Sequence, residues 1–158
     1  MPADRYPLSL GLEVASLATG FAAIAGLWLS WVLLNREFPG RRALGILTTM
    51  AMALPAPLVC YYLLGVLGRA WRVTPGGLVA AGVVSAMPLL ARSARAAFAS
   101  LEPQYGKAAR SLGASDWRVF WRIELPLAHR AILAAVGFAF ARVLAELAAA
   151  FWIADPRV

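Results

Sequence analysis

Few residues of this chain could support metal or redox chemistry. It has one cysteine, Cys60, and one histidine, His129, among 158 residues. One thiol cannot form an internal disulfide, and these two residues are too few for a zinc site of the Cys/His kind. The sequence also contains no HExxH, GxSxG or CxxC pattern and no Walker sequence GxxxxGK[S/T]. We therefore predict no catalytic residue, no metal site, no cofactor and no ATPase site in this chain.

Acidic residues are scarce as well. The chain has eight Asp and Glu against fifteen Lys and Arg, for a formal net charge of +7, and only 15% of its residues are charged. Hydrophobic residues make up 61% and the mean hydropathy is +0.70, whereas a soluble domain is about half apolar and about a quarter charged. These values exclude a soluble domain and a disordered chain. The length accommodates roughly four membrane-spanning helices of about 20 residues each.

Four stretches are long and apolar enough to cross a bilayer. They lie at about residues 10–35, 43–68, 76–97 and 131–154. We therefore predict an all-α fold, a polytopic membrane helical bundle with about four transmembrane helices. Pro55 and Pro57 fall within the second stretch and Pro88 within the third. Proline removes a backbone hydrogen bond inside a helix, so Pro55 and Pro88 mark candidate kinks beside a pore.

The fourth stretch is the one that carries charges in its interior. Arg142 and Glu146 are four residues apart, so they lie on one face of a helix and can pair. A charge at the centre of a bilayer costs roughly 2.5 to 3.5 kcal/mol, so both side chains should point into the bundle or into an aqueous cavity. The pair either braces helix packing or takes part directly in a substrate path, and the sequence leaves both interpretations open.

Basic residues gather in two of the connections between these stretches. Three lie at residues 36–42 and seven at residues 92–130, against two at residues 69–72. Cytoplasmic segments of membrane proteins carry an excess of Lys and Arg. We therefore predict that the first and third connections are cytoplasmic and that both ends of the chain lie on the opposite side of the membrane.

The third connection, residues 98–130, is long and organised, which is typical of a functional segment. Gln104–Leu112 is compatible with a short helix, and Gly113 provides a glycine end for it. Ser115 can then cap a second helix, which we expect to end at Leu125-Pro126 because proline disrupts a helix interior. Two short helices with a basic surface on either side of a glycine indicate a docking element.

Several separated positions of this connection carry a family resemblance. Lys107-Ala108-Ala109 is followed after three residues by Gly113, after nine more by Ile123, and after one more by Leu125-Pro126. This spacing resembles the EAA loop of the permease subunits of binding-protein-dependent ABC importers, with Lys107 in place of the usual Glu. In that family the helix before the glycine is a coupling helix, which inserts into the ATP-binding subunit. The resemblance implies that these residues couple this chain to an ATPase subunit.

The resemblance extends over residues 10–154 and points to the molybdate/tungstate permease branch, with sulfate permeases close to it. It is carried further by Leu54-Pro55 with Tyr61-Tyr62-Leu63-Leu64, by residues 88–96 and by residues 138–146. That branch usually reads Gly-Glu-Phe-Gly around an intramembrane glutamate, where this chain has Ala145-Glu146-Leu147-Ala148. Members of the branch continue into a further span, so we expect this chain to lack a C-terminal helix.

The resemblance implies a multi-pass permease of the inner (plasma) membrane that imports an oxyanion. Its implied partners are two copies of an ATP-binding cassette subunit, an extracytoplasmic solute-binding protein, a second permease copy in a homodimer, and the lipid bilayer. Because the chain has no Walker sequence, ATP would be hydrolysed by the separate cassette subunit.

Other functions stay open from the residues alone. A permease for sulfate or an organic solute would share the same loop, and a non-transporting membrane scaffold is a third hypothesis. A small membrane enzyme is disfavoured because Glu102, Asp116 and Glu124 are scattered through the basic loop, where we expect them to be solvated. A net charge of +7 would suit a nucleic-acid binder, but such modules are not flanked by membrane spans, so we predict no nucleic-acid partner.

Overall fold

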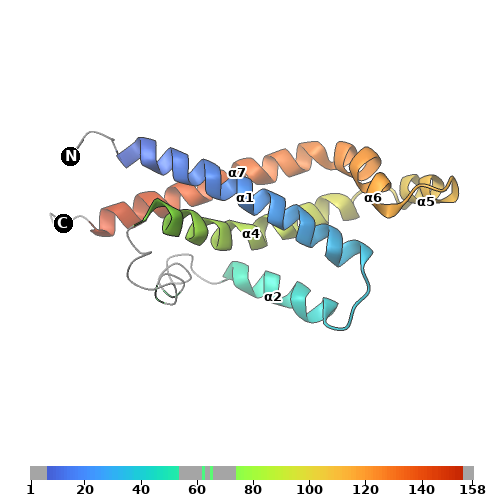
Figure 1. Ribbon diagram of the computed structural model, residues 1–158, viewed down its shortest axis with the longest axis horizontal. Coiled ribbons are helices and arrows are strands. Elements are labelled where there is room, and N and C mark those ends of the chain that lie inside the picture. The colour runs from blue at the N-terminus through green and yellow to red at the C-terminus, as the bar shows by residue number, and fades with distance from the viewer. Residues whose placement is uncertain (1–6, 54–61, 63–64, 66–73, 155–158) are drawn as a thin grey trace.

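The computed structural model describes residues 7–53, 62, 65 and 74–154, and the regular elements within those residues are all helices. They are α1 (Pro7–Asn35), α2 (Arg41–Ala53), α4 (Pro75–Ala99), α5 (Pro103–Ser111), α6 (Asp116–Val119), the π-helical segment η1 (Phe120–Glu124) and α7 (Leu125–Ala154). The long helices α1, α4 and α7 run side by side as the body of a bundle, and α2 lies against α4 (Figure 1). The predicted all-α class is confirmed.

Three helices in the described residues are long and apolar enough to cross a membrane: Ser9–Asn35, Pro75–Ala99 and Asp116–Ala148. They correspond to the spans predicted at 10–35, 76–97 and 131–154. The predicted second span, 43–68, begins within α2. Most of its remainder, including Pro55 and Pro57, lies outside the described residues. The described part of the chain therefore accounts for three of the four predicted crossings.

Small side chains allow the three long helices to approach one another closely. Ala15, Ala18 and Ala22 of α1 join Ala86 of α4 and Ala139 of α7 in the main core cluster, and all five are fully buried. The spacing of three and four residues places the α1 alanines on one face of that helix. Within a bilayer, helices associate through van der Waals contact, which small residues at the interface favour. The alanine pattern therefore specifies which faces meet.

Two glycines mark especially close approaches between α1 and α4. A Cβ atom on Gly26 of α1 would lie 3.0 Å from the backbone N of Ala91 in α4. A Cβ atom on Gly82 of α4 would lie 2.8 Å from the Cβ of Ala18 in α1. Side chains rarely come this close, so the observed separation of the two helices requires glycine at both positions.

The helix continues through Leu125 and Pro126, so the expected helix end at this pair is wrong. The elements α6, η1 and α7 follow one another without a gap. Proline normally disrupts a helix because its ring meets the carbonyl four residues earlier. Here the turn directly before Pro126 is π-helical, and the Leu125 N–H donates to the Phe120 carbonyl five residues back. This wider turn alters the path of the backbone ahead of the proline ring, so the helix can continue.

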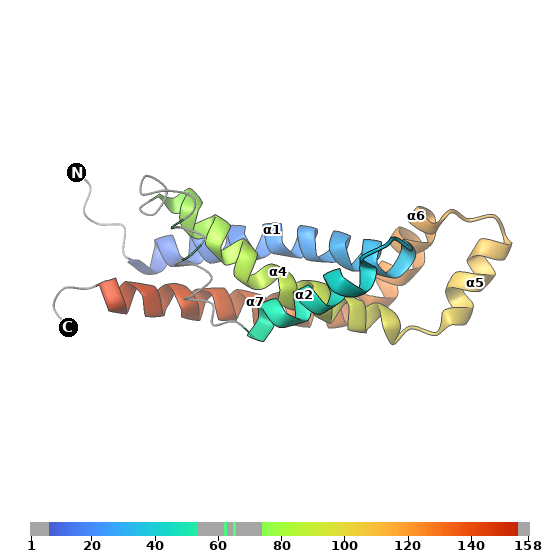
Figure 2. The ribbon, with the colours of Figure 1, turned by 90° about the horizontal axis from the view of Figure 1, so that it is seen from below.

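The turn between α1 and α2 lies at the same end of the bundle as α5 and α6. Pro7, where α1 begins, and Ala154, where α7 ends, lie at the opposite end (Figure 1, Figure 2). The two connections that are predicted to share one side of the membrane are thus at one end of the bundle. We call this end, which holds residues 36–42 and 98–130, the basic end.

We expect Gly26→Ala to lower the stability of the protein by about 1 to 3 kcal/mol, because the added methyl group overpacks the contact with α4. Gly20→Ala is the matched control, since Gly20 lies in the same helix and a Cβ atom there meets nothing within 4 Å. Alanine is favoured over glycine inside a helix by roughly 0.5 to 1 kcal/mol, so this control should keep or raise the unfolding temperature. Thermal unfolding in detergent measures both, and equal midpoints would contradict the close approach.

Candidate functional site

The predicted helix before Gly113 is present as α5, and glycine geometry ends it. Gly113 has a φ of +82°, in the left-handed region that residues with a side chain rarely adopt. The Gly113 N–H donates to the Arg110 carbonyl at 2.9 Å, and the Ala114 N–H donates to the Ala109 carbonyl at 3.0 Å. This is a Schellman arrangement, which satisfies carbonyls at the end of a helix. The second helix then starts as predicted, with the Ser115 hydroxyl accepting from the Arg118 N–H at 3.4 Å.

The first half of the predicted coupling motif is on the surface. Lys107, Ala108 and Gly113 are exposed and Ala109 is half-buried, on or beside α5, which projects beyond the spanning helices (Figure 2). Leu112, which follows the last residue of α5, is 88% exposed. A large exposed apolar side chain at the tip of a projecting helix is typical of a protein interaction site.

The second half of the motif connects this tip to the bundle. Ile123 and Leu125 are half-buried in η1 and at the start of α7, and Pro126 beside them is exposed. Leu125 packs against a core cluster that contains Phe98 of α4 and Phe120 of η1. The motif therefore contains an outer part suited to docking and an inner part that anchors it.

Aromatic side chains fix this anchor to two of the long helices. The Phe120 ring of η1 lies 6.2 Å from that of Trp31 in α1 and 5.5 Å from that of Phe98 in α4, both at steep angles. Trp117 of α6 meets Trp31 edge to face at 5.8 Å. Such pairs stabilise by about 0.5 to 1.5 kcal/mol beyond their buried area. Trp117 and Phe120 therefore join α6 and η1 to α1 and α4 by direct contact.

Arg110 of α5 bridges the two short helices, a role that was not predicted from the sequence. Its Nε lies 2.7 Å from Oδ1 of Asp116 in α6, and its Nη2 lies 3.7 Å from Oε1 of Glu124 in η1. Asp116 and Glu124 are therefore paired, not simply solvated as expected. Gly106 leaves space for the guanidinium, because a Cβ atom there would lie 2.9 Å from Nη1. A glycine one helical turn before an arginine was the only local signal. We call Arg110, Asp116 and Glu124 the loop ion cluster.

Arg142 and Glu146 pair as their spacing predicts. Nε of Arg142 lies 2.9 Å from Oε1 of Glu146 within α7. Ser85 of α4 completes the group, because its Oγ lies 3.1 Å from Oε1 and 2.8 Å from Oε2 of Glu146. A hydroxyl has one proton, so it donates to one of these oxygens at a time. We call these three residues the bundle polar cluster, which joins α4 to α7.

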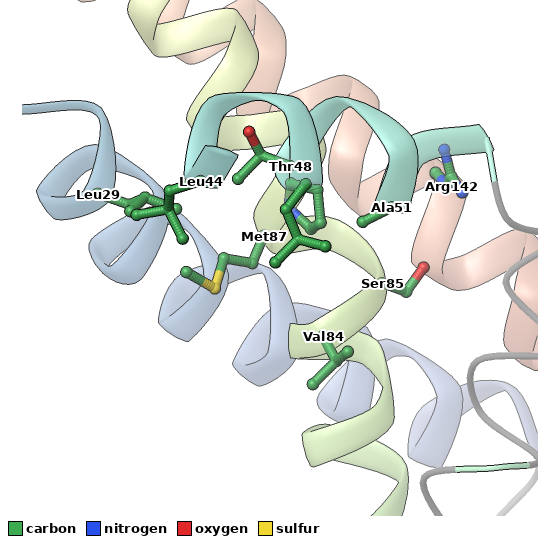
Figure 3. A pocket seen from close by; sticks show the side chains of 10 residues that line it. Leu29, Leu44, Thr48, Ala51, Val84, Ser85, Met87 and Arg142 are labelled. Carbon is green, nitrogen blue, oxygen red and sulfur yellow. The ribbon is translucent and has the colours of Figure 1, made fainter. Parts of the chain in front are cut away.

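A cavity of about 300 Å³ lies beside this cluster, among residues of α1, α2, α4 and α7 (Figure 3). Ser85 and Arg142 lie on one side of it, and Leu29 and Leu44 lie on the opposite side (Figure 3). Pro88, the predicted kink residue of α4, also lines it. Among the described residues, Arg142 makes its hydrogen bond through Nε alone. Its two Nη groups can therefore donate to a ligand in the cavity.

Apolar helices of membrane length and a projecting two-helix loop indicate a polytopic membrane protein with a loop suited to docking. A family model for the inner membrane component of binding-protein-dependent transport systems matches residues 18–157. The match covers most of the chain, so the protein belongs to this family of importer permease subunits and is an inner-membrane protein. The predicted family is confirmed.

Individual relatives are named for the transport of molybdenum, of molybdate or tungstate, and of sulfate. The chain is 35% identical to the molybdenum transport permease ModB of Escherichia coli K12, over 89% of this chain and 67% of ModB. It is 32% identical to the molybdate/tungstate permease WtpB of Thermococcus kodakarensis, over 96% of this chain and 62% of WtpB. It is also 33% identical to the sulfate permease CysT of Escherichia coli K12, over 89% of this chain and 55% of CysT.

A double-mutant cycle tests the pairing in the bundle polar cluster. Arg142→Leu and Glu146→Leu should each destabilise the protein, because each leaves a charge without its partner in apolar surroundings. The double variant should recover part of the loss, with a coupling energy of about 1 to 3 kcal/mol. Unfolding of the purified protein in detergent measures the cycle, and strictly additive losses would contradict the pairing. Glu13→Leu, which removes an exposed acid of α1, controls for the added apolar side chain.

Proposed function

We propose that this chain is the permease that moves a tetrahedral oxyanion, molybdate or tungstate, into the cell. The likeness to ModB and WtpB and the resemblance of residues 88–96 and 138–146 to that branch support this cargo. Sulfate has the same shape and charge, and the likeness to CysT makes it the second candidate. The anion arrives on an extracytoplasmic binding protein, and two ATP-binding cassette subunits drive two copies of the permease.

In this proposal the cavity beside the bundle polar cluster forms part of the transport path. The free Nη groups of Arg142 donate to the passing oxyanion, a geometry that suits a planar guanidinium. Glu146 orients Arg142 through Nε and offsets its charge, so the anion binds without being trapped, as passage requires. Pro88 has no N–H for the Val84 carbonyl, which weakens α4 beside the cavity and allows it to bend. Pro55 stays a candidate for the same path.

Coupling to ATP uses the basic end. Residues Lys107, Ala108 and Ala109 dock to the cassette subunit, with Leu112 as an apolar contact at the tip. Displacement of α5 passes through the Gly113 turn and the loop ion cluster to α6. The observation that carries the proposal is the continuous helix from α6 through η1 to α7, which contains both the end of the docking loop and Arg142.

Substitution of Gly113 tests the coupling. Gly113→Pro should reduce ATP-driven uptake by about tenfold or more, because proline fixes φ near −65° and cannot adopt the observed +82°. Gly113→Asn should keep most of the activity, since Asn tolerates the left-handed region. Uptake and stimulated ATP hydrolysis are measured in proteoliposomes with the cassette subunit and the binding protein. Unchanged uptake after the proline substitution would contradict the coupling role.

The cargo is tested in the same proteoliposomes by direct measurement of accumulated anion. We expect uptake of molybdate and tungstate, mutual competition between them, and little inhibition by excess sulfate. Arg142→Gln should reduce uptake, whereas Arg130→Gln, which alters an exposed arginine outside the cavity, should not. Preferred sulfate uptake would replace molybdate with the second candidate. Absence of oxyanion uptake together with stimulated ATP hydrolysis would indicate an organic solute, and absence of any association with a cassette subunit would indicate a scaffold.

A further inference from the structure

A second hollow lies at the basic end, apart from the cavity beside the bundle polar cluster. It has a volume of about 660 Å³ and lies between α2 and α4. Arg41, Arg42 and Arg95 line it, and its other walls include Ile46 and Met50. Among the described residues, none of the three guanidinium groups takes part in an ion pair. Three unpaired cations around one hollow favour an anionic ligand.

The walls of this hollow change from charged to apolar along α2. Arg42, Ile46 and Met50 are spaced by four residues, so they lie on one helix face in order from the basic end. Ile46 is 60% exposed and Met50 is 63% exposed, so both apolar side chains are open to a ligand. A small anion in water gains nothing from an apolar wall. An amphipathic ligand would contact the arginines with its charged group and the apolar wall with its hydrocarbon.

Arg95 closes the hollow from the side of α4. A Cβ atom on Gly45 of α2 would lie 3.3 Å from Nη1 of Arg95, so the guanidinium rests against the α2 backbone at a residue without a side chain. The charge therefore comes from two helices, and a ligand held by Arg95 and Arg42 would bridge them. The arrangement is more specific than a general excess of positive charge at a membrane surface.

We propose that this hollow binds an anionic phospholipid, with the phosphate among Arg41, Arg42 and Arg95 and an acyl chain along Ile46 and Met50. Basic pockets between transmembrane helices on the cytoplasmic side are settings in which anionic headgroups bind, and the basic end is the predicted cytoplasmic end. The bound lipid holds α2 against α4 at the end that docks to the ATPase. The proposal depends on the membrane location of the chain and not on its cargo.

The test is lipid binding to the whole purified chain in detergent, measured by native mass spectrometry with phosphatidylglycerol and with phosphatidylcholine. We expect phosphatidylglycerol to bind at least tenfold more tightly. The triple variant Arg41→Gln, Arg42→Gln, Arg95→Gln should lose on the order of 100-fold in affinity, from about fivefold for each charge. The matched control is Arg118→Gln, Arg122→Gln, Arg130→Gln, which removes three exposed arginines that lie outside the hollow. The control should bind within about twofold of the natural chain.

Two further measurements separate lipid binding from the alternatives: one uses a variant that fills the hollow, and the other uses anions without acyl chains. Gly45→Leu retains every charge and fills the hollow beside Arg95, so it should also abolish the preference for phosphatidylglycerol, even if the triple variant fails to fold. Inorganic phosphate and glycerol 3-phosphate carry the headgroup chemistry without acyl chains and should not bind at lipid concentrations. Equal losses in the two triple variants would overturn the proposal in favour of general surface charge. Tight binding of inorganic phosphate would overturn it in favour of a free oxyanion site.

Discussion

Helical geometry runs without a break from Asp116 to Ala154, although Pro126, which has no backbone N–H to donate, lies inside this length. The proposed coupling depends on that continuity. A helix that ended at the proline would leave the docking loop attached to the bundle by a flexible joint, and movement of α5 would be absorbed there. The π turn of η1 lets the helix pass the proline ring. It therefore places α6 and Arg142 in one continuous helix, some seven helical turns apart.

A second constraint is the close packing of α4 against α7, which brings Ser85 to Glu146. Ser85 reaches Glu146 where α4 passes close to α7, since a Cβ atom on Gly82 of α4 would lie 3.2 Å from Cγ1 of Val143 in α7. A larger side chain at Gly82 would move the hydroxyl away from the carboxylate. The small residues of the core thus determine the chemistry of the polar cluster as well as the packing. As a consequence, substitutions of these small core residues should change both the stability of the protein and the shape of the cavity.

Features that depend on neighbouring residues in the chain could be predicted from the sequence, and features that depend on distant residues could not. The membrane-length helices, the Gly113 turn, the Ser115 cap and the pairing of Arg142 with Glu146 follow from patterns within a few residues. The contact of Ser85 with Glu146 joins positions 61 residues apart, so no local pattern reports it. The error at Pro126 has a local origin, because the rule that proline ends a helix ignores the π turn that accommodates it.

The two arginine clusters use the same chemistry in opposite physical settings. In the loop ion cluster the side chains of Arg110 and Asp116 are 40% and 57% exposed, and such pairs contribute about 0 to 1 kcal/mol because water screens them. Its geometry can therefore adjust at little cost, and in the proposed coupling it follows α5 while it keeps α5 joined to α6. Arg142 and Glu146 are 27% and 19% exposed within an apolar helix, where separating the charges is far more costly. Under the proposed function, a transported anion would compete for Arg142 because it replaces one negative partner with another, whereas simple separation of the pair is disfavoured. In the proposed mechanism the basic end is therefore the adjustable part of the chain, and the bundle polar cluster is the part that would respond to the cargo.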